Sequence, residues 1–342
     1  MVMGVALMLV GAACRGEPAQ QPEEGEADQA GGGLIVAFIP TRTNTYINEW
    51  ARGAVQTAGE LGYELKLIEN DFDQAEQDTQ VQQQLGSGED VAAYVWWPSD
   101  NAAGVASLQA LSESGVPVIQ TNQFPFEGTE DLVVGYAGVD DKLNGRVAAE
   151  LVVEARDALE ASGHEMHSDG GNAVIVGFAP AGYQAGIDRS GAARPILEEA
   201  GIDILGEIEA GFDPTTGYDG MKQLLAAHKG EGIDLVYAHN SALAEGVIQA
   251  LEEEGFSPGE DVMVVGGTCH GNLEYLEEGK EFATGLQAAF LEGVFSIRTL
   301  DEYLTTGELK EFSNFIPNPP VHGDEIDEVE LEGYSVEELC VY

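Results

Sequence analysis

Short apolar runs alternate with segments of helical spacing from Leu34 onward. The apolar runs are LIVAFI, ELKLIE, VAAYVWW, VPVIQT, LVVGYAG, NAVIVGFA, DILGEIEAG, DLVYAH, VMVVGG and FATGLQAAF. Between them lie amphipathic stretches such as residues 49–62 and 240–255, and each ends at a glycine, which helix C-termini prefer. Near-continuous apolar strands that alternate with helices indicate parallel sheets covered on both faces. Ten such strands exceed one ordinary sheet, so the pattern predicts an α/β protein with two doubly wound parallel-sheet lobes.

Polar side chains follow the first apolar run at once, in the stretch FIPTRTNTYINEW at residues 38–50. A phosphate-binding loop would use glycines to bring backbone N–H groups close to the anion, but no glycine lies between this run and Gly53. The stretch offers hydroxyls, amides, one cation and aromatic rings, and Asn44 and Tyr46 are among them. Ligands of doubly wound folds bind beyond the carboxyl ends of strands, so this loop suits a neutral polar ligand with an apolar face. A plain polar turn between strand and helix is the other interpretation.

Composition limits the possible partners. The 342 residues exceed the size at which one core usually stops growing, so two domains are expected. Asp and Glu number 61 against 14 Lys and Arg, a net charge of -47 spread along the whole chain. Nucleic acid is excluded as a partner because its phosphates need a basic patch, and an anionic ligand is disfavoured. So many distributed carboxylates favour a halophilic protein, because high salt screens their mutual repulsion.

The first fourteen residues, MVMGVALMLVGAAC, form an apolar run that ends in small residues before Cys14. They resemble a bacterial lipoprotein signal, whose cysteine becomes the lipidated N-terminus. The match is partial, because no Lys or Arg precedes the run and Gly11 stands where Leu is usual. Residues 15–33 are rich in Pro, Gly, Glu and Gln, which predicts a disordered acidic tether. A lipid anchor and a tether would hold the folded part at the membrane, outside the cytoplasm, at the cell surface or in the periplasm.

Only Cys269 and Cys340 remain after Cys14. Two cysteines of an exported protein can pair, but their separation along the chain says nothing about their proximity, and there is no cysteine-dense framework. A disulfide and two free thiols both stay open.

Seven segments, in this order and spacing, carry a family resemblance: LGYELKLIEND, VWWPSDNAAGVASLQAL, GVPVIQTN, GYAGVDDKLNGRVAAELV, TTGYDGMKQLLAAH, YAHNSALAEGVIQALEEEG and VMVVGG. The chain resembles the type I periplasmic binding proteins, specifically the ribose-binding-protein-like branch, over residues 34–307. The resemblance implies a two-lobed receptor that closes on a sugar-like ligand and delivers it to the membrane subunits of an ABC importer. It also implies three hinge crossings, with one lobe of residues 33–139 and 288–316 and another of residues 140–287 and 317–342.

The resemblance also implies a ligand site. Asn44 and Tyr46 match the family's asparagine and stacking phenylalanine, so residues 38–50 become one lip of the cleft. Arg189 matches the family's cleft arginine. Asn240 and Gln287 match a ligand-binding asparagine and a hinge-side glutamine. Planar amides and a guanidinium can hold sugar hydroxyls in fixed directions, while an aromatic ring packs on the C–H face of the sugar.

Three further cleft positions depart from the family pattern. Asn122 and Gln123 stand where many sugar binders have Asp-Arg, and Thr268 stands where they have Asp. These neutral residues favour a ligand other than ribose. Arg189 is then the only basic residue that the resemblance places in the cleft, and we expect its donors to be taken by ligand oxygens and amides rather than by a carboxylate. The expected ligand is a neutral sugar or polyol.

Aromatic residues near the strand ends are candidates for stacking on this ligand. Trp96 and Trp97 end the third strand, and alternation sends one ring into the core and the other outward. Phe124 and Tyr183 lie on loops at the edge of the expected cleft. Trp97, Phe124 and Tyr183 are equally compatible with a ligand contact and with packing inside the protein.

Two histidines, His164 and His167, have acidic neighbours in the stretch HEMHSD and could bind a metal if the stretch were helical. The stretch lies between a helix that ends near Ser162 and a strand that starts at Asn172, amid Ser and Gly. A solvated connector is therefore favoured, and we expect neither a metal nor a cofactor.

No catalytic motif stands in its usual context in the sequence. The one G-x-S-x-G match, GFSPG at residues 255–259, follows a helical stretch and precedes an apolar run, whereas a nucleophile elbow leads from a strand into a helix. Cys269 beside His270 is no catalytic pair, because adjacent side chains rarely face one another. We expect a monomeric binding protein rather than an enzyme. The alternatives are a secreted α/β enzyme that acts on a carbohydrate and a sugar-sensing receptor of the same fold that is not coupled to transport. A cytoplasmic sugar-responsive repressor would carry a basic helix-turn-helix where this chain has an acidic stretch.

Overall fold

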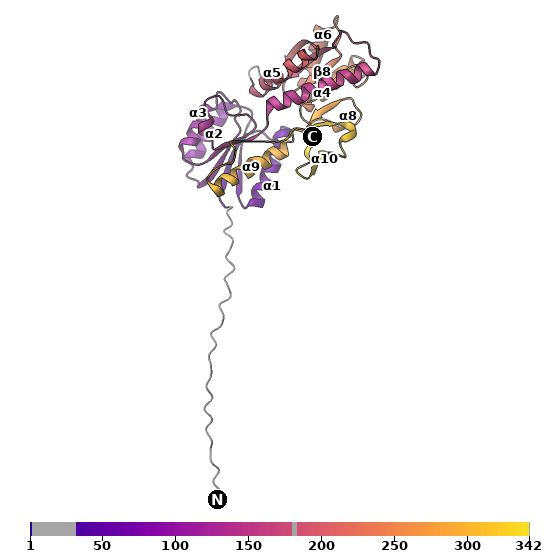
Figure 1. Cartoon of the computed structure of the whole chain (residues 1–342). Coiled ribbons are helices and arrows are strands. Elements are labelled where there is room, and N and C mark those ends of the chain that lie inside the picture. The colour runs from indigo at the N-terminus through magenta and orange to yellow at the C-terminus, as the bar shows by residue number, and fades with distance from the viewer. Residues whose placement is uncertain (2–31, 180–182, 342) are drawn as a thin grey trace. The chain divides into compact units, whose positions relative to one another are not determined.

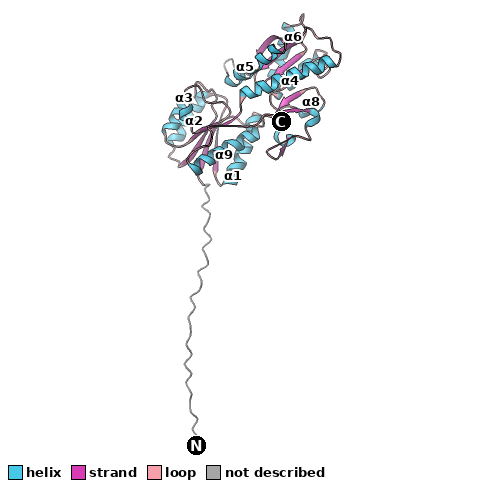
Figure 2. Ribbon diagram, viewed as in Figure 1, coloured by secondary structure: helices cyan, strands magenta, loops and turns pink. Residues whose placement is uncertain are grey.

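Two six-stranded sheets form the centre of the molecule (Figures 1 and 2). The computed structural model describes residue 1, residues 32–179 and residues 183–341, and those from Gly32 onward belong to one compact unit. The prediction of two doubly wound parallel-sheet lobes is confirmed, and each of the ten apolar runs contains one of the strands β1 to β10.

The first sheet is wholly parallel, with the strand order β11-β5-β4-β3-β1-β2. Its strands are β1 (Leu34–Pro40), β2 (Glu64–Asn70), β3 (Val91–Trp96), β4 (Val118–Gln120), β5 (Gly135–Gly138) and β11 (Ser313–Phe315). The helices that cover it are α1 (Thr45–Leu61), α2 (Gln74–Gly86), α3 (Val105–Glu113) and α9 (Ala289–Thr306), and a short 3-10 helix, η1 (Glu130–Leu132), precedes β5.

Alternate residues of β1 enter two different cores, because side chains of a strand point to opposite faces of its sheet. Ile35 and Ile39 pack in the cluster that contains Trp50 of α1 and Ile297 of α9. Val36 and Phe38 pack in the cluster on the opposite face, which contains side chains of α2 and α3. Figure 1 shows α2 and α3 on one side of this sheet and α1 and α9 on the other. Burial on both faces explains the continuous apolar run.

The second sheet has the order β12-β10-β9-β8-β6-β7, and only its edge strand β12 is antiparallel to its neighbour. Its strands are β6 (Asn172–Gly177), β7 (Asp203–Glu209), β8 (Leu235–Ala238), β9 (Met263–Val265), β10 (Ala283–Gly285) and β12 (Pro320–His322). The helices of this part of the chain are α4 (Asp141–Ala161), α5 (Gln184–Glu199), α6 (Pro214–Ala227), α7 (Ser241–Glu253) and α8 (Leu273–Glu277). α4 and α5 pack on one face of the sheet, and α6 and α7 on the other.

The chain passes between the two sheets three times. It leaves β5 for α4, leaves β10 for α9, and leaves β11 for β12. β11 and β12 were not among the predicted strands, because both stand at sheet edges and only Val321 of their six residues is buried, so neither carries an apolar run. The crossings place residues 34–138 and 313–315 in the first sheet and its connections, and residues 172–285 and 320–322 in the second.

The C-terminal segment is held by a disulfide bond. Cys269 and Cys340 are paired, with their Cα atoms 5.2 Å apart, which decides between the two possibilities that the sequence left open. The segment contains η2 (Gly323–Glu325), the two-stranded sheet of β13 (Glu330–Leu331) and β14 (Tyr334–Ser335), and α10 (Val336–Leu339). Its apolar side chains pack in one cluster with Phe290 and Val294 of α9.

No helix among the described residues is long and apolar enough to cross a membrane. The predicted lipoprotein signal of residues 2–14, with Cys14, and residues 15–31 of the predicted tether lie outside the described residues.

Candidate ligand-binding site

One pocket lies at the carboxyl ends of both sheets. It contains about 530 Å³ of empty space, its mouth included. Each of the strands β1 to β10 is followed within four residues by a side chain that lines the pocket. The lining residues are Asn44, Tyr46, Ile47, Phe72, Trp97, Asn122, Val139, Asp141, Phe178, Tyr183, Ala185, Arg189, Phe212, Asn240, Thr268 and Gln287.

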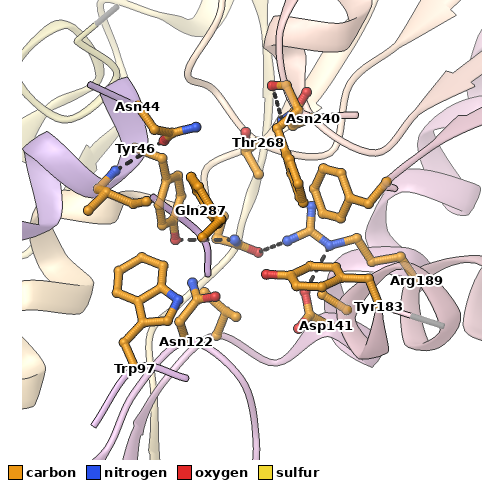
Figure 3. A pocket seen from close by; sticks show the side chains of 16 residues that line it. Asn44, Tyr46, Trp97, Asn122, Asp141, Tyr183, Arg189, Asn240, Thr268 and Gln287 are labelled. Carbon is orange, nitrogen blue, oxygen red and sulfur yellow. Dashed lines mark hydrogen bonds and ion pairs between the residues drawn. The ribbon is translucent and has the colours of Figure 1, made fainter. Parts of the chain in front are cut away.

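The start of α1 presents Asn44 and Tyr46 to the pocket (Figure 3). Asn44 is the N-cap of α1, and its side-chain oxygen accepts a hydrogen bond from the backbone N–H of Ile47 at 3.3 Å. The amide nitrogen of Asn44 makes no hydrogen bond to the described residues, so it is available to a ligand. Both interpretations of residues 38–50 therefore apply: the stretch forms a turn from strand to helix, and it lines the pocket.

Arg189 of α5 is the cation among the lining residues named above, and only 3% of its surface is exposed. Its Nε donates to Oδ1 of Asp141 at 2.8 Å, one Nη donates to the backbone oxygen of His239, and the other donates to Oε1 of Gln287 at 3.2 Å. The expectation that Arg189 lacks a carboxylate partner was wrong. Asp141 occupies the first turn of α4, and the ion pair balances the guanidinium charge inside the protein.

Gln287 connects the two sides of the pocket. It lies between β10 and α9, at one of the crossings, and Figure 3 shows it between Tyr46 and Arg189. Its Nε2 donates to the hydroxyl of Tyr46 at 3.2 Å, and its Oε1 accepts from Arg189 and, at 2.9 Å, from Asn144 of α4. Because Arg189 can only donate, its contact with Oε1 fixes the orientation of the Gln287 amide.

Glu292 of α9 lies behind this side of the pocket, fully buried. Its carboxylate accepts hydrogen bonds from the hydroxyl of Tyr46 at 2.9 Å and from Nδ2 of Asn122 at 3.3 Å. Burial raises the pKa of Glu292 to about 7, while the hydrogen bonds from Tyr46 and Asn122 oppose that shift. Burial also raises the pKa of Tyr46, so its hydroxyl keeps its proton and donates it to Glu292. Asn122 has a φ of 64°, a left-handed conformation that asparagine tolerates better than most residues.

Aromatic rings form two walls. On the first-sheet side, Trp97 packs edge-on against Tyr46, with ring centroids 6.3 Å apart, and also against Trp50. On the second-sheet side, Phe178, Tyr183 and Phe212 contact one another. Such rings can cover the C–H faces of a ligand without satisfying its polar groups.

Phe72 and Phe212 stack across the pocket, with ring planes 11° apart and centroids 6.0 Å apart. Phe72 follows β2 of the first sheet, and Phe212 follows β7 of the second. Phe72 also has a φ of 56°, a conformation that costs an aromatic residue free energy and is held by its surroundings.

His239 and Asn240, which follow β8, hold the loops that form the aromatic wall on the second-sheet side. Asn240 is the N-cap of α7: its Oδ1 accepts from Leu243 at 2.7 Å, and its Nδ2 donates to the backbone oxygen of Phe212 at 3.1 Å. Burial lowers the pKa of His239 well below its usual value, and nearby Arg189 lowers it further, so the ring is neutral. Its Nδ1 accepts from the backbone N–H of Phe178 at 3.1 Å. The loops that carry Phe178 and Phe212 are thus fixed by buried hydrogen bonds.

The structure brings most of the sequence-predicted residues together. Lining the pocket are Asn44, Tyr46, Trp97, Asn122, Tyr183, Arg189, Asn240, Thr268 and Gln287.

Gln123 does not line the pocket, although the sequence analysis placed it in the cleft, and Phe124, for which a ligand contact and packing were both open, does not line it either. The Nε2 of Gln123 donates to the backbone oxygen of Pro98 at 2.7 Å, so the side chain is used inside the first lobe. Phe124 contacts Tyr136, Phe312 and Phe315. The left-handed turn at Asn122 directs that side chain toward Glu292, while the two residues that follow point elsewhere.

The sequence analysis did not single out seven lining residues: Ile47, Phe72, Val139, Asp141, Phe178, Ala185 and Phe212. Five of them, Phe72, Val139, Asp141, Phe178 and Phe212, follow a strand of the structure within three residues, so the position itself was the available signal. Asp141 stood in the quoted segment GYAGVDDKLNGRVAAELV, but which of two adjacent aspartates faces the pocket depends on how α4 starts.

Hydroxyl groups are the chemistry that this pocket fits. Three of the five N–H groups of Arg189 have partners within the described part of the chain and two have none there, and Asn44 adds further donors. Among the described residues, the Asp141 carboxylate accepts a hydrogen bond only from Arg189, so its Oδ2 is available as an acceptor. A ligand with hydroxyl groups on neighbouring carbons can accept hydrogen bonds from these donors and donate one to this acceptor, while its apolar faces contact the two aromatic walls.

Two sheet-centred lobes that share one pocket define a two-lobed α/β ligand receptor. Residues 35–309 match the family model described as periplasmic binding protein domain, so the chain belongs to the periplasmic binding protein family, as the resemblance predicted.

Named relatives lie in the same family. The ribose import binding protein of Escherichia coli is 27% identical over 272 residues, which cover 79% of this chain and 84% of the relative. A crystal structure of a periplasmic ribose ABC transporter from Conexibacter woesei aligns with a TM-score of 0.75 and 23% identity, over 92% of this chain and 99% of that one. An ABC transporter solute binding protein from Bacillus halodurans with bound myo-inositol aligns with a TM-score of 0.73 and 24% identity, over 87% and 97% of the two chains. These two structures show the shared fold.

Proposed function

We propose that this chain is an extracytoplasmic solute-binding protein that captures a neutral sugar or polyol between its lobes and delivers it to the membrane subunits of an ABC importer. The names of the relatives support the class of ligand, because they include ribose and myo-inositol, two neutral polyhydroxylated solutes. The protein acts as a binding protein and not as an enzyme. The apolar run that ends at Cys14 supports a lipid anchor, and the protein works as a monomer.

The Arg189–Asp141 ion pair is the main observation in support of a neutral ligand. Both side chains are more than nine-tenths buried, and their charges cancel. A phosphorylated or carboxylated ligand would bring a net negative charge beside Asp141, and desolvating that charge without a free cation is costly. A neutral polyol brings no such cost and can still donate to Asp141 and accept from Arg189.

Calorimetric titration against pentoses, hexoses and linear polyols tests the proposal. We expect one of these neutral compounds to bind with one site per chain and to be recovered unchanged. Binding only of phosphorylated or carboxylated compounds would contradict the neutral ligand, and conversion of the compound during the titration would favour the enzyme.

A substitution at Asn44 tests the site itself. Asn44→Ser keeps a good helix cap but removes the amide donors, so the affinity for the ligand should fall by about 0.5–1.5 kcal/mol, the value of one neutral hydrogen bond. Asn272→Ser is the matched control, because Asn272 caps α8 and does not line the pocket. If both variants bind the ligand as the unmodified protein does, Asn44 is not a ligand residue.

A further inference from the structure

Three metal-ligating side chains converge on the second lobe, outside the pocket. His164 and His167 lie in the loop between α4 and β6, and Asp234 directly precedes β8. Nδ1 of His167 lies 2.6 Å and Nε2 of His164 lies 3.3 Å from Oδ1 of Asp234. One donor atom from each of the three residues lies within 4.8 Å of the other two. The sequence showed only the two histidines, and the structure adds the third donor.

The loop reaches this arrangement without being helical. Residues 164–166 have no regular structure, and residues 167–170 form a bend and a turn. The two histidines are therefore not brought together by a helix, which the sequence analysis had required for a metal site. Instead, the backbone N–H of His167 donates to Oδ2 of Asp234 at 3.2 Å, which folds the loop around the carboxylate.

The Asp234 carboxylate is oriented for coordination. Its side chain is fully buried, and its Oδ2 accepts backbone N–H groups of Asn172, at 2.8 Å, and His167. These backbone contacts fix the carboxylate and leave Oδ1 directed at the two imidazole rings. The pKa of Asp234 lies below its usual value because these hydrogen bonds outweigh the effect of burial, so the group is a carboxylate at neutral pH.

We propose that His164, His167 and Asp234 bind one divalent transition cation, of which Zn²⁺ is the probe ion, with water as a fourth ligand. Two imidazole nitrogens and one carboxylate oxygen are the donors that Zn²⁺ takes, at about 2.0–2.2 Å each. Ligand atoms around a tetrahedral zinc are about 3.3 Å apart, so small shifts of the partly buried His164 ring and the exposed His167 ring complete the site. Mg²⁺ and Ca²⁺ need several oxygen donors, and this cluster supplies one residue with oxygen ligands.

The cation would act on the lobe and not on the sugar. Asp234 is at the amino end of β8, while Asn240 follows its carboxyl end and lines the pocket. At about 3.3 Å per residue the two ends of this segment are about 20 Å apart. A bound cation would cross-link the loop before β6 to the start of β8, two strands that are neighbours in the sheet. It would therefore stabilise the second lobe and leave sugar affinity unchanged.

Zinc titration tests the site, with excess Ca²⁺ present to occupy the many surface carboxylates. We expect saturable binding of one Zn²⁺ per chain and an upward shift of the thermal unfolding midpoint. Co²⁺ in place of Zn²⁺ should give the intense visible bands of four-coordinate cobalt. His164→Gln and His167→Gln should each weaken Zn²⁺ by more than about tenfold, because a ligand is lost while the amide can still hydrogen-bond to Asp234.

His322→Gln is the matched control, because His322 pairs with a single exposed carboxylate, Glu154, at 3.6 Å. It should bind Zn²⁺ like the unmodified protein. Absence of a saturable site above the Ca²⁺ background, or equal affinity in the His164, His167 and His322 variants, would overturn the proposal and reduce the cluster to a hydrogen-bonded loop anchor. A change in sugar affinity on adding Zn²⁺ would overturn the separation of the two sites.

Discussion

Asp141→Asn should change the charge preference of the pocket. The substitution keeps the size of the side chain, and the amide oxygen can still accept from Nε of Arg189, which lies 2.8 Å from the carboxylate oxygen in the present structure. What it removes is the negative charge. The buried guanidinium is then the only charge among the lining side chains.

The magnitude follows from the burial of the pair. Arg189 is 3% exposed and Asp141 is 8% exposed, so solvent screens little of the lost attraction. Breaking a buried ion pair costs about 3–5 kcal/mol, which appears as lower stability of the ligand-free variant. A neutral sugar loses a hydrogen bond to a charged acceptor, about 1.5–3 kcal/mol, or about 10- to 150-fold in affinity. A sugar acid instead supplies a carboxylate about 4 Å from the guanidinium, worth up to about 4 kcal/mol at a protein-like dielectric.

The assay compares the neutral ligand and its aldonic acid by calorimetric titration, in the unmodified protein and in Asp141→Asn, after circular dichroism has shown that the variant is folded. The unmodified protein should prefer the neutral compound, and the variant should reverse that preference. A variant that binds the neutral sugar with unchanged affinity and gains none for the acid would refute the argument that the ion pair sets the charge preference.

Three further predictions concern the whole molecule. With a net charge of -47, the thermal midpoint should rise between 0.1 M and 1 M salt, because the screening length falls from about 10 Å to about 3 Å; a flat midpoint would contradict the halophilic interpretation. Burial raises the pKa of Glu281 from 4.5 to about 8, so stability should fall by about 5 kcal/mol as pH rises from 4.5 through 8. Glu281→Gln, which keeps the acceptor of Ser241, should remove this contribution in denaturant titrations and leave the one that the raised pKa of Glu292 makes in the same pH range; an unchanged pH dependence of stability would contradict the assignment to Glu281. Reduction of Cys269–Cys340, which are 71 residues apart, should cost about 4 kcal/mol of unfolding free energy, whereas no loss would mean that the C-terminal packing holds the segment alone.

The alternation of apolar runs and helices was sufficient to predict the sheets. Eight of the ten predicted strands are buried at most or all of their positions, so their sequences are largely apolar and easy to recognise. The edge strands β2 and β7 are only partly buried and carry charged residues among the apolar ones. β12 escaped because its three residues at a sheet edge, of which only Val321 is buried, carry no pattern. The disulfide was equally beyond prediction, because the proximity of Cys269 and Cys340 depends on how the last segment packs on α9.

The pocket shows where strand position is informative and where it is not. Each of the ten predicted strands is followed by a lining residue, so strand position indicated the loops that form the pocket. Within a loop, the choice depends on backbone angles that the sequence does not display. Asn122 faces Glu292 because its backbone is left-handed, and Gln123 and Phe124 turn away from the pocket for the same reason.

Asp141 shows that the prediction of a neutral ligand rested on an incomplete reason. The sequence favoured a neutral ligand because Asn122 and Thr268 replace charged residues of the family and appeared to leave Arg189 unpaired. An unpaired guanidinium would in fact attract an anion, so the missing carboxylate would have argued for an acidic ligand. The carboxylate is present, but on α4, which belongs to the same lobe as α5 and packs against it through Gly145, where a side chain would collide with the backbone of Arg189. The close approach of these two helices forms the ion pair before any ligand arrives, and it is this preformed neutral pair that suits the pocket to hydroxyl groups.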